Sequence, residues 1–191
     1  MSTMENGCDE EDCGLPAPPR TLVHTRQERE LAAATWLLLA AADSRTARRE
    51  WAVFGVALLR CGVLFSAVRV PADIVHRAAG TEDRRGVAAF LREALAGGPV
   101  FYDEGGRQFY ALTPVSTARM WNLPEAECLG HDTLLGVPAT ELTERDPRCA
   151  AFWVVPMEGP AALCLPGEVA HLVLSARPGT GKGPHADPGR R

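Results

Sequence analysis

Four apolar stretches of the chain end at a proline. Proline has no N–H to donate to a strand ladder and restricts the residue before it, so each stretch predicts a short buried strand that stops there. The stretches are residues 67–71, 110–114, 134–138 and 153–156. Together they predict a strand-rich core between about residues 63 and 157.

Helical patterning begins before this core. Thr25 is a predicted N-cap, and Glu28 stands at the position that completes a capping box. The pattern predicts a helix that runs to about Ala42, and the apolar residues expected to be buried are Leu31, Trp36, Leu38 and Leu39. The charged residues 45–50 predict a break, whereas 51–60 fits either a second short helix or a strand.

The rest of the folded part alternates strands and helices. Expected helices are 72–79, 83–96 with Thr81 as the cap, a short turn over 116–121, and 167–175. Expected strands are 64–70, 127–129, 133–137, 152–155, and a hairpin of 99–103 and 107–113 around Glu104-Gly105-Gly106. Helices followed by a mostly antiparallel sheet predict an α+β fold in which N-terminal helices pack on that sheet.

Composition sets the domain organisation. With 191 residues the chain is long enough for one domain with a proper core. Residues 1–22 are rich in acids and prolines and predict a disordered acidic tail, and 177–191 predict a flexible Gly/Pro/Arg tail. Residues 24–176 are then a single α+β domain.

Charge and residue usage narrow the class of protein. The net charge of −4 argues against a generic polyanion binder. Nineteen of the twenty basic residues are arginine, which is typical of a high-GC bacterium such as an actinomycete. The N-terminus lacks the pattern of a signal peptide, and the longest apolar stretch, 31–42, is too short to span a bilayer. A cytoplasmic protein with reduced cysteines and no membrane partner is expected.

Metal and catalytic motifs are sparse. Cys128 and His131 have ligand-like spacing, but structural zinc sites usually supply two close pairs and this is one. These two residues are the metal candidate, although no metal or other cofactor is expected. The chain has no Gly-x-Ser-x-Gly motif and no assembled set of catalytic residues. The sequence therefore assigns no catalytic residue and favours a protein that is not an enzyme.

A small group of cations is the candidate for anion binding. Arg69, Arg107 and Arg119 fall in or beside predicted strand ends, and His131 lies in a turn between two strands. If these ends converge, they form a cationic rim for a phosphate or carboxylate. The alternative is that they are solvated arginines of a sheet. A second group, the aromatic residues Tyr110, Trp121 and Trp153, is expected in the core.

Several phrases resemble known proteins. They are residues 65–71, 98–100 followed by 107–112, 128–138 and 153–156. Over these phrases the chain resembles a group of small actinomycete proteins and, more distantly, the later half of primase–polymerase-type domains. Those enzymes hold metal ions with an acidic pair on a strand, and the best-placed strand here, 66–69, has no acid. The resemblance therefore implies nucleotide or DNA binding without polymerisation, with His131 at a matching position.

Three hypotheses follow. The first is a non-catalytic binding or regulatory protein that acts through a protein partner. The second is a nucleotide or nucleic-acid binder that uses the cationic rim. The third is an enzyme that acts on a small metabolite at a site that the sequence does not identify.

Overall fold

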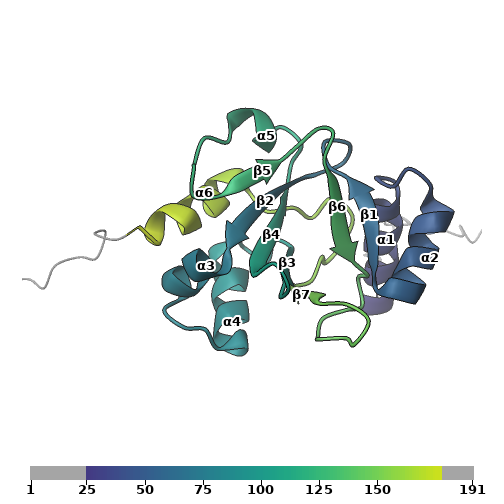
Figure 1. Cartoon of the computed structure of the whole chain (residues 1–191), viewed down its shortest axis with the longest axis horizontal. Helices are drawn as coiled ribbons and strands as arrows, with labels where there is room; N and C mark the ends of the chain where they lie inside the picture. The colour runs from purple at the N-terminus through teal and green to yellow at the C-terminus, as the bar shows by residue number, and fades with distance from the viewer. Residues whose placement is uncertain (1–24, 178–191) are drawn as a thin grey trace, which may run out of the picture.

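The computed structural model of the chain describes residues 25–177. The predicted tail 1–22, and all of the predicted tail 177–191 except its first residue, lie outside the described residues. The described part is an α+β structure in which N-terminal helices pack on antiparallel strands (Figure 1). The predicted fold class is confirmed.

The larger sheet has five antiparallel strands in the order β5-β2-β4-β3-β7. Their bounds are Ser66–Pro71 for β2, Val100–Asp103 for β3, Gln108–Thr113 for β4, Glu127–Leu129 for β5 and Ala151–Val155 for β7. A smaller antiparallel pair is formed by β1 (Val56–Arg60) and β6 (Leu134–Pro138). Strands β3 and β4 form the predicted hairpin. The prediction that four strands stop at proline is also confirmed, since β2, β4, β6 and β7 end at or just before their prolines.

Two hydrophobic cores lie on the two faces of the large sheet. The helices α3 (Ala72–Ala79), α4 (Arg84–Ala94) and α6 (Pro166–Ser175) cover one face. The helices α1 (Arg26–Leu38) and α2 (Ser44–Phe54), together with β1 and β6, cover the other. Figure 1 shows these two groups on opposite sides of β2, β4 and β3. Because side chains alternate along a strand, Phe109 and Leu112 of β4 enter different cores.

Helix α1 differs from its prediction in length and in orientation. Thr25 and Glu28 form the predicted capping box. The helix ends at Leu38 rather than near Ala42, and its buried residues are Ala33, Leu37 and Leu38. The burial predicted for Leu31 and Leu39 is wrong, because these side chains are 69% and 65% exposed. They lie on the face of α1 that points away from the core.

The predicted charged break at 45–50 is also wrong. Asp43 caps a helix that starts at Ser44 and continues to Phe54, where Gly55 ends it in the left-handed conformation with φ 73°. The charged side chains occupy the solvent side, while Ala47 and Trp51, four residues apart, are buried. The open choice over 51–60 resolves into the end of α2 followed by β1.

The remaining helices follow their predictions closely. Helix α3 has the predicted bounds, and α5 (Thr117–Met120) is the predicted helical turn. Helix α4 is capped by Asp83, whose carboxylate accepts from the Gly86 N–H, and not by Thr81. Among the residues that the structure describes, no helix is long and apolar enough to cross a membrane.

Candidate ligand-binding site

The structure does not gather the four cations of the predicted rim. Arg69, on β2, forms an ion pair with Glu127 on the neighbouring strand β5. Arg107 lies in the hairpin turn at one end of β2, where its carbonyl accepts from the Ala72 N–H. Arg119 on α5 and His131 after β5 lie towards the other end of β2, which spans about 17 Å at 3.3 Å per residue. One ligand phosphate cannot contact both ends.

Cys128 and His131 have different environments. Cys128 is half-buried and packs against the core under α3 and α4, and burial raises the pKa of its thiol to about 11. His131 is exposed, with Nδ1 3.9 Å from Oδ1 of Asp132. Within residues 25–177, no group of three or more His, Cys, Asp or Glu side chains is placed to hold a metal ion.

Two further cysteines, Cys61 and Cys164, are buried. Burial raises the pKa of the Cys61 thiol to about 11 and that of Cys164 to about 12. The thiolate is the form of cysteine that attacks substrates or binds metals. Burial therefore favours the protonated thiol at both positions.

A groove of about 620 Å³ lies between α2 and β1, and His131 of the predicted rim is among its lining residues. Two of its acidic side chains are already engaged by backbone N–H groups: Asp43 accepts from Arg45, and Glu50 accepts from Leu58. Its other walls include the exposed apolar side chains Leu58 and Leu134. The volume is large, but these polar groups serve the local fold.

A second groove, of about 400 Å³, gathers four arginines. It lies between α4 and β7, and we call it the arginine groove; the arginines are Arg26, Arg84, Arg85 and Arg92. Three of them come from α4, where positions 84, 85 and 92 share a face with Ala88. The small Ala88 side chain leaves space between the longer guanidinium groups.

The arginine groove is positively charged. Arg26 pairs with Glu30 at 2.7 Å, whereas neither Arg85 nor Arg92 has an ion-pair partner in the part of the chain that the structure describes. Glu144 is the one carboxylate among the described residues that line this groove. The guanidinium charges therefore exceed the charge that these residues supply to balance them.

The first turn of α4 adds to this field. Arg84 and Arg85 directly follow the N-cap, and the turn contains no acidic residue. The N-terminus of a helix carries a partial positive charge, so cations there cost stability. The Asp83 carboxylate at the N-cap offsets the partial charge of the helix end, so the positive potential where an anion would bind comes from the guanidinium groups.

A slot of about 230 Å³ adjoins the arginine groove on the face of the sheet. We call it the aromatic slot, because Phe109, Tyr102 and Phe152 stand beside one another on β4, β3 and β7. The rings of Tyr102 and Phe109 are stacked, with centroids 4.4 Å apart and planes at 29°. Phe152 meets Tyr102 edge-on at 5.9 Å. The slot thus has a continuous aromatic floor.

Polar groups frame the aromatic floor. Arg145 and Glu104 form an ion pair of 2.6 Å at its edge, and Glu82 lies on the side of the α3–α4 connection. His76 of α3 meets the Phe109 ring edge-on at 5.9 Å. Its Nδ1 is buried and has no hydrogen-bond partner among the described residues. The slot combines a flat apolar surface with several donors and acceptors.

Arg84 belongs to both the slot and the groove. Its guanidinium lies 4.4 Å from the centroid of the Phe152 ring, and Nη2 donates to the Thr143 carbonyl at 2.5 Å. A cation over a ring face and a hydrogen bond together fix the orientation of the side chain. Arg84 therefore places a cation at a fixed position between the aromatic floor and the other arginines.

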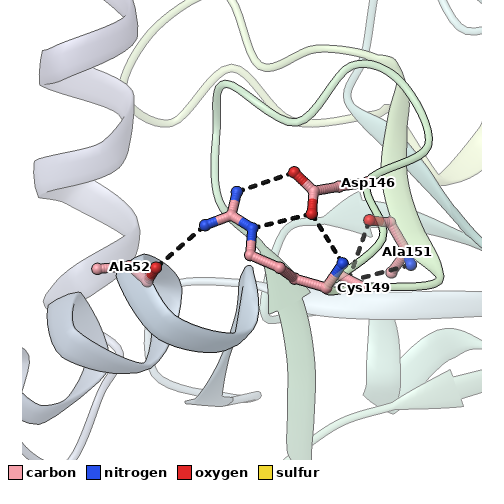
Figure 2. A network of polar contacts seen from close by, with 5 residues as sticks. Ala52, Asp146, Cys149 and Ala151 are labelled. Carbon is pink, nitrogen blue, oxygen red and sulfur yellow. Dashed lines mark hydrogen bonds and ion pairs between the residues drawn. The ribbon is translucent and has the colours of Figure 1, made fainter.

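The loop that carries Thr143, Glu144 and Arg145 is anchored by Arg148 (Figure 2). The Arg148 guanidinium donates to both carboxylate oxygens of Asp146 at 2.9 Å and to the Ala52 carbonyl of α2 at 3.0 Å. The side-chain hydrogen bonds from Arg148 lower the pKa of Asp146 to about 2. This network fastens one wall of the groove to the opposite layer of the fold.

One sequence signal for this site was present in α4. Arg84, Arg85 and Arg92 lie within the predicted helix 83–96, and their spacing places them on one helical face. The aromatic residues of the slot are Tyr102, Phe109 and Phe152, whereas the sequence prediction for aromatic residues names Tyr110, Trp121 and Trp153.

Those aromatic residues lie away from the slot. Trp153 is confirmed in the core at 1% exposed, and Tyr110 stacks on Phe101 at 4.8 Å on the opposite face of the sheet. Trp121 is half-buried and donates to the Ala126 carbonyl at 2.8 Å. None of the three lines the aromatic slot.

Comparisons with family models, curated proteins and solved structures find no match to this chain.

Proposed function

We propose that the protein is a non-catalytic binder of a nucleotide, with the phosphates in the arginine groove and the base in the aromatic slot. The observation that carries this proposal is that the two sites adjoin at Arg84, which lines both. A nucleotide has the same two parts in the same order, a planar ring system followed by phosphates.

The arginine groove supports the phosphate half of the proposal. Guanidinium groups present planar, bidentate donors that match phosphate oxygens. Arg85 and Arg92 have no ion-pair partner among the described residues, so they are available to a ligand without loss of such a pair. Taken together, the groove and the slot reach the 300–1,000 Å³ range of small-molecule sites.

The aromatic slot supports the base half. Phe109 and Phe152 are almost fully buried, so Tyr102, which is half-buried, presents the more accessible ring. Stacking of a base on an aromatic side chain contributes about 1–3 kcal/mol. The polar frame around this ring supplies hydrogen-bonding groups for the edge of a base.

Two observations favour binding of a free nucleotide without catalysis. Glu144 is the one carboxylate among the described residues that line the phosphate half of the site, whereas Glu82 and Glu104 line the base half and Glu104 is paired with Arg145. Metal-assisted nucleotidyl transfer uses at least an acidic pair at the phosphates. The net charge of −4 and the small volume suit a mononucleotide better than a nucleic-acid strand.

The test is calorimetric titration of the full chain at low ionic strength with nucleoside triphosphates, nucleosides and inorganic triphosphate. We expect triphosphates of nucleosides to bind more tightly than either part alone. An exposed arginine–phosphate contact is worth about 1 kcal/mol, so the double variant R85A/R92A is expected to bind roughly 30-fold more weakly. Arg119→Ala is the matched control, because Arg119 is an exposed arginine of the predicted rim that lies outside the groove.

A second variant separates the two halves of the site. Tyr102→Leu keeps an apolar side chain but removes the ring, and we expect it to weaken nucleotide binding while leaving inorganic triphosphate binding unchanged. The proposal is wrong if no nucleotide binds at low ionic strength. It is also wrong if R119A weakens binding as much as R85A/R92A does.

A further inference from the structure

The start of the chain concentrates negative charge in one short segment. Five acids lie within the first twelve residues, and four of them are consecutive: Glu5, Asp9, Glu10, Glu11 and Asp12. We call residues 5–12 the acidic segment, which lies outside the described residues. Residues 13–24 contain no acid, and nowhere else in the sequence are more than two acids adjacent. A run of carboxylates of this kind fits a cationic surface.

The acidic segment is joined to the described chain at the arginine groove. Arg26 is the first residue of α1, and it lines that groove together with Arg84, Arg85 and Arg92. Asp12 stands 14 positions before Arg26, and a chain of this length reaches at most about 46–50 Å. Arg85 and Arg92 are separated by about 10 Å along α4. The acids of the same molecule are therefore within reach of every arginine in the groove.

The charges of the segment and of the groove are complementary. Neither Arg85 nor Arg92 has an ion-pair partner in the described part of the chain, and Glu144 is the one carboxylate among the described residues of the groove. A guanidinium group donates two parallel hydrogen bonds to a carboxylate, as it does to a phosphate. In an extended run, Asp9 and Asp12 would be about 10 Å apart, which matches the spacing of the two arginines. The segment thus offers the groove the same chemistry as a ligand with several phosphates.

We propose that the acidic segment occupies the arginine groove of its own molecule and competes there with the phosphates of a ligand. Each exposed pair of charges is weak and is screened by salt. Attachment through residues 13–25 offsets this weakness, because a short linker gives an effective concentration in the millimolar range. Occupancy is therefore reversible, and a polyphosphate displaces the segment. The competition rests on the proposed function, whereas occupancy of the groove does not.

Disulfide trapping tests where the segment lies. Cys8 and Cys13 flank its four consecutive acids. Ala88 lines the groove, and its neighbour Ala89 is more exposed and does not line it. The variants A88C and A89C are oxidised mildly in the full chain, and peptide mapping locates the disulfides. We expect A88C to bond to Cys8 or Cys13 about fivefold faster than A89C does. Without docking, the more exposed thiol of A89C would react at least as fast.

Equal rates for A88C and A89C overturn the proposal. Cross-links that join two copies of the chain also overturn it, because the occupant is then not the segment of the same molecule. Inorganic triphosphate, added at low ionic strength, is expected to slow the cross-linking of A88C but not that of A89C. Triphosphate that binds in a calorimetric titration and leaves the A88C rate unchanged overturns the competition. Thermal melts check that both variants are folded.

Neutralisation of the acids tests the competition while the groove stays unaltered. E10Q/E11Q removes two charges from the segment. E127Q/D132N is the matched control, because it makes the same change in net charge on and just after β5, at the opposite edge of the sheet from β7. We expect E10Q/E11Q to bind inorganic triphosphate about threefold more tightly than the wild type, and the control to bind as the wild type does. A gain no greater than that of the control overturns the competition.

The two proposals fail in different ways. Fast cross-linking of A88C in a protein that binds neither nucleotide nor triphosphate overturns the proposed function and the competition, but it supports occupancy of the groove by the segment. Nucleotide binding together with equal rates for A88C and A89C supports the proposed function and overturns the occupancy.

Discussion

The same charge reversal, arginine to glutamate, at each end of α4 provides the sharpest test of the arginine groove. Arg85 stands in the first turn of the helix and Arg92 in the last. Both line the groove. A cation is unfavourable at the N-terminus of a helix and favourable at its C-terminus, by about 0.3–1 kcal/mol for an exposed side chain. The two residues therefore have the same expected role in binding but opposite effects on stability.

The substitutions are Arg85→Glu and Arg92→Glu. Reversal from cation to anion changes the interaction with the dipole by about 1 kcal/mol, which corresponds to roughly 2–4 °C in Tm for a domain of this size. We expect R85E to raise Tm by this amount and R92E to lower it by a similar amount. Both should weaken nucleotide binding at least about tenfold, because each replaces a phosphate ligand with a repelling charge.

The assay is thermal denaturation followed by circular dichroism at low ionic strength, with calorimetric titration of the same samples. Salt weakens the effect on Tm because the charges are exposed. If R85E lowers Tm, the cationic first turn of α4 does not cost stability and the reasoning is wrong. If either variant binds a nucleotide as tightly as the wild type, that residue does not contact the ligand.

Three further predictions concern the stability and packing of the fold. Asp146 has its pKa lowered to about 2 by Arg148, so its contribution to stability is full above the unfolded value near 4 and is lost as pH falls from about 4 to 2. D146N should flatten the acid limb of a stability-against-pH curve in that window, and an unchanged limb would contradict the network in Figure 2. At Gly98 an added Cβ would lie 2.6 Å from Sγ of Cys164, so G98A should cost about 1–3 kcal/mol in urea denaturation. G159A, where an added Cβ meets nothing within 4 Å, is the control and should be neutral. Burial raises the pKa of Cys61 and Cys164, so alkylation of these two thiols at pH 8, located by peptide mapping, should be slow in the native protein and fast in urea. Rapid labelling of either thiol in the native protein would contradict its burial.

Local patterns predicted the elements but not how they face one another. The capping box at Thr25 and the hairpin around Glu104 depend on residues near in sequence, and both are present in the structure. The face that α1 buries depends on which layer packs against it. The sequence pattern therefore predicts burial for Leu31 and Leu39, which the structure exposes to solvent.

The candidate site depends on contacts between residues that are far apart in the sequence. The arginine groove exists because β7 is the edge strand beside β3, which brings residues near 153 close to α4. Nothing in the sequence fixes that order of strands. Likewise, the aromatic slot depends on the register that places Tyr102 between Phe109 and Phe152. The rim of Arg69, Arg107, Arg119 and His131 is predicted on the assumption that strand ends converge, but Arg107 lies at one end of β2 while Arg119 and His131 lie towards the other.

The most direct test of nucleotide binding at α4 is an amide chemical-shift titration of the full chain with a nucleoside triphosphate. We expect the largest shifts on residues 84–92, on Tyr102 and its neighbours in β3, and on Phe152 and Val154 in β7. Shifts that concentrate instead around Arg69, Arg119 and His131, or a spectrum that the nucleotide leaves unchanged, would contradict binding at this site.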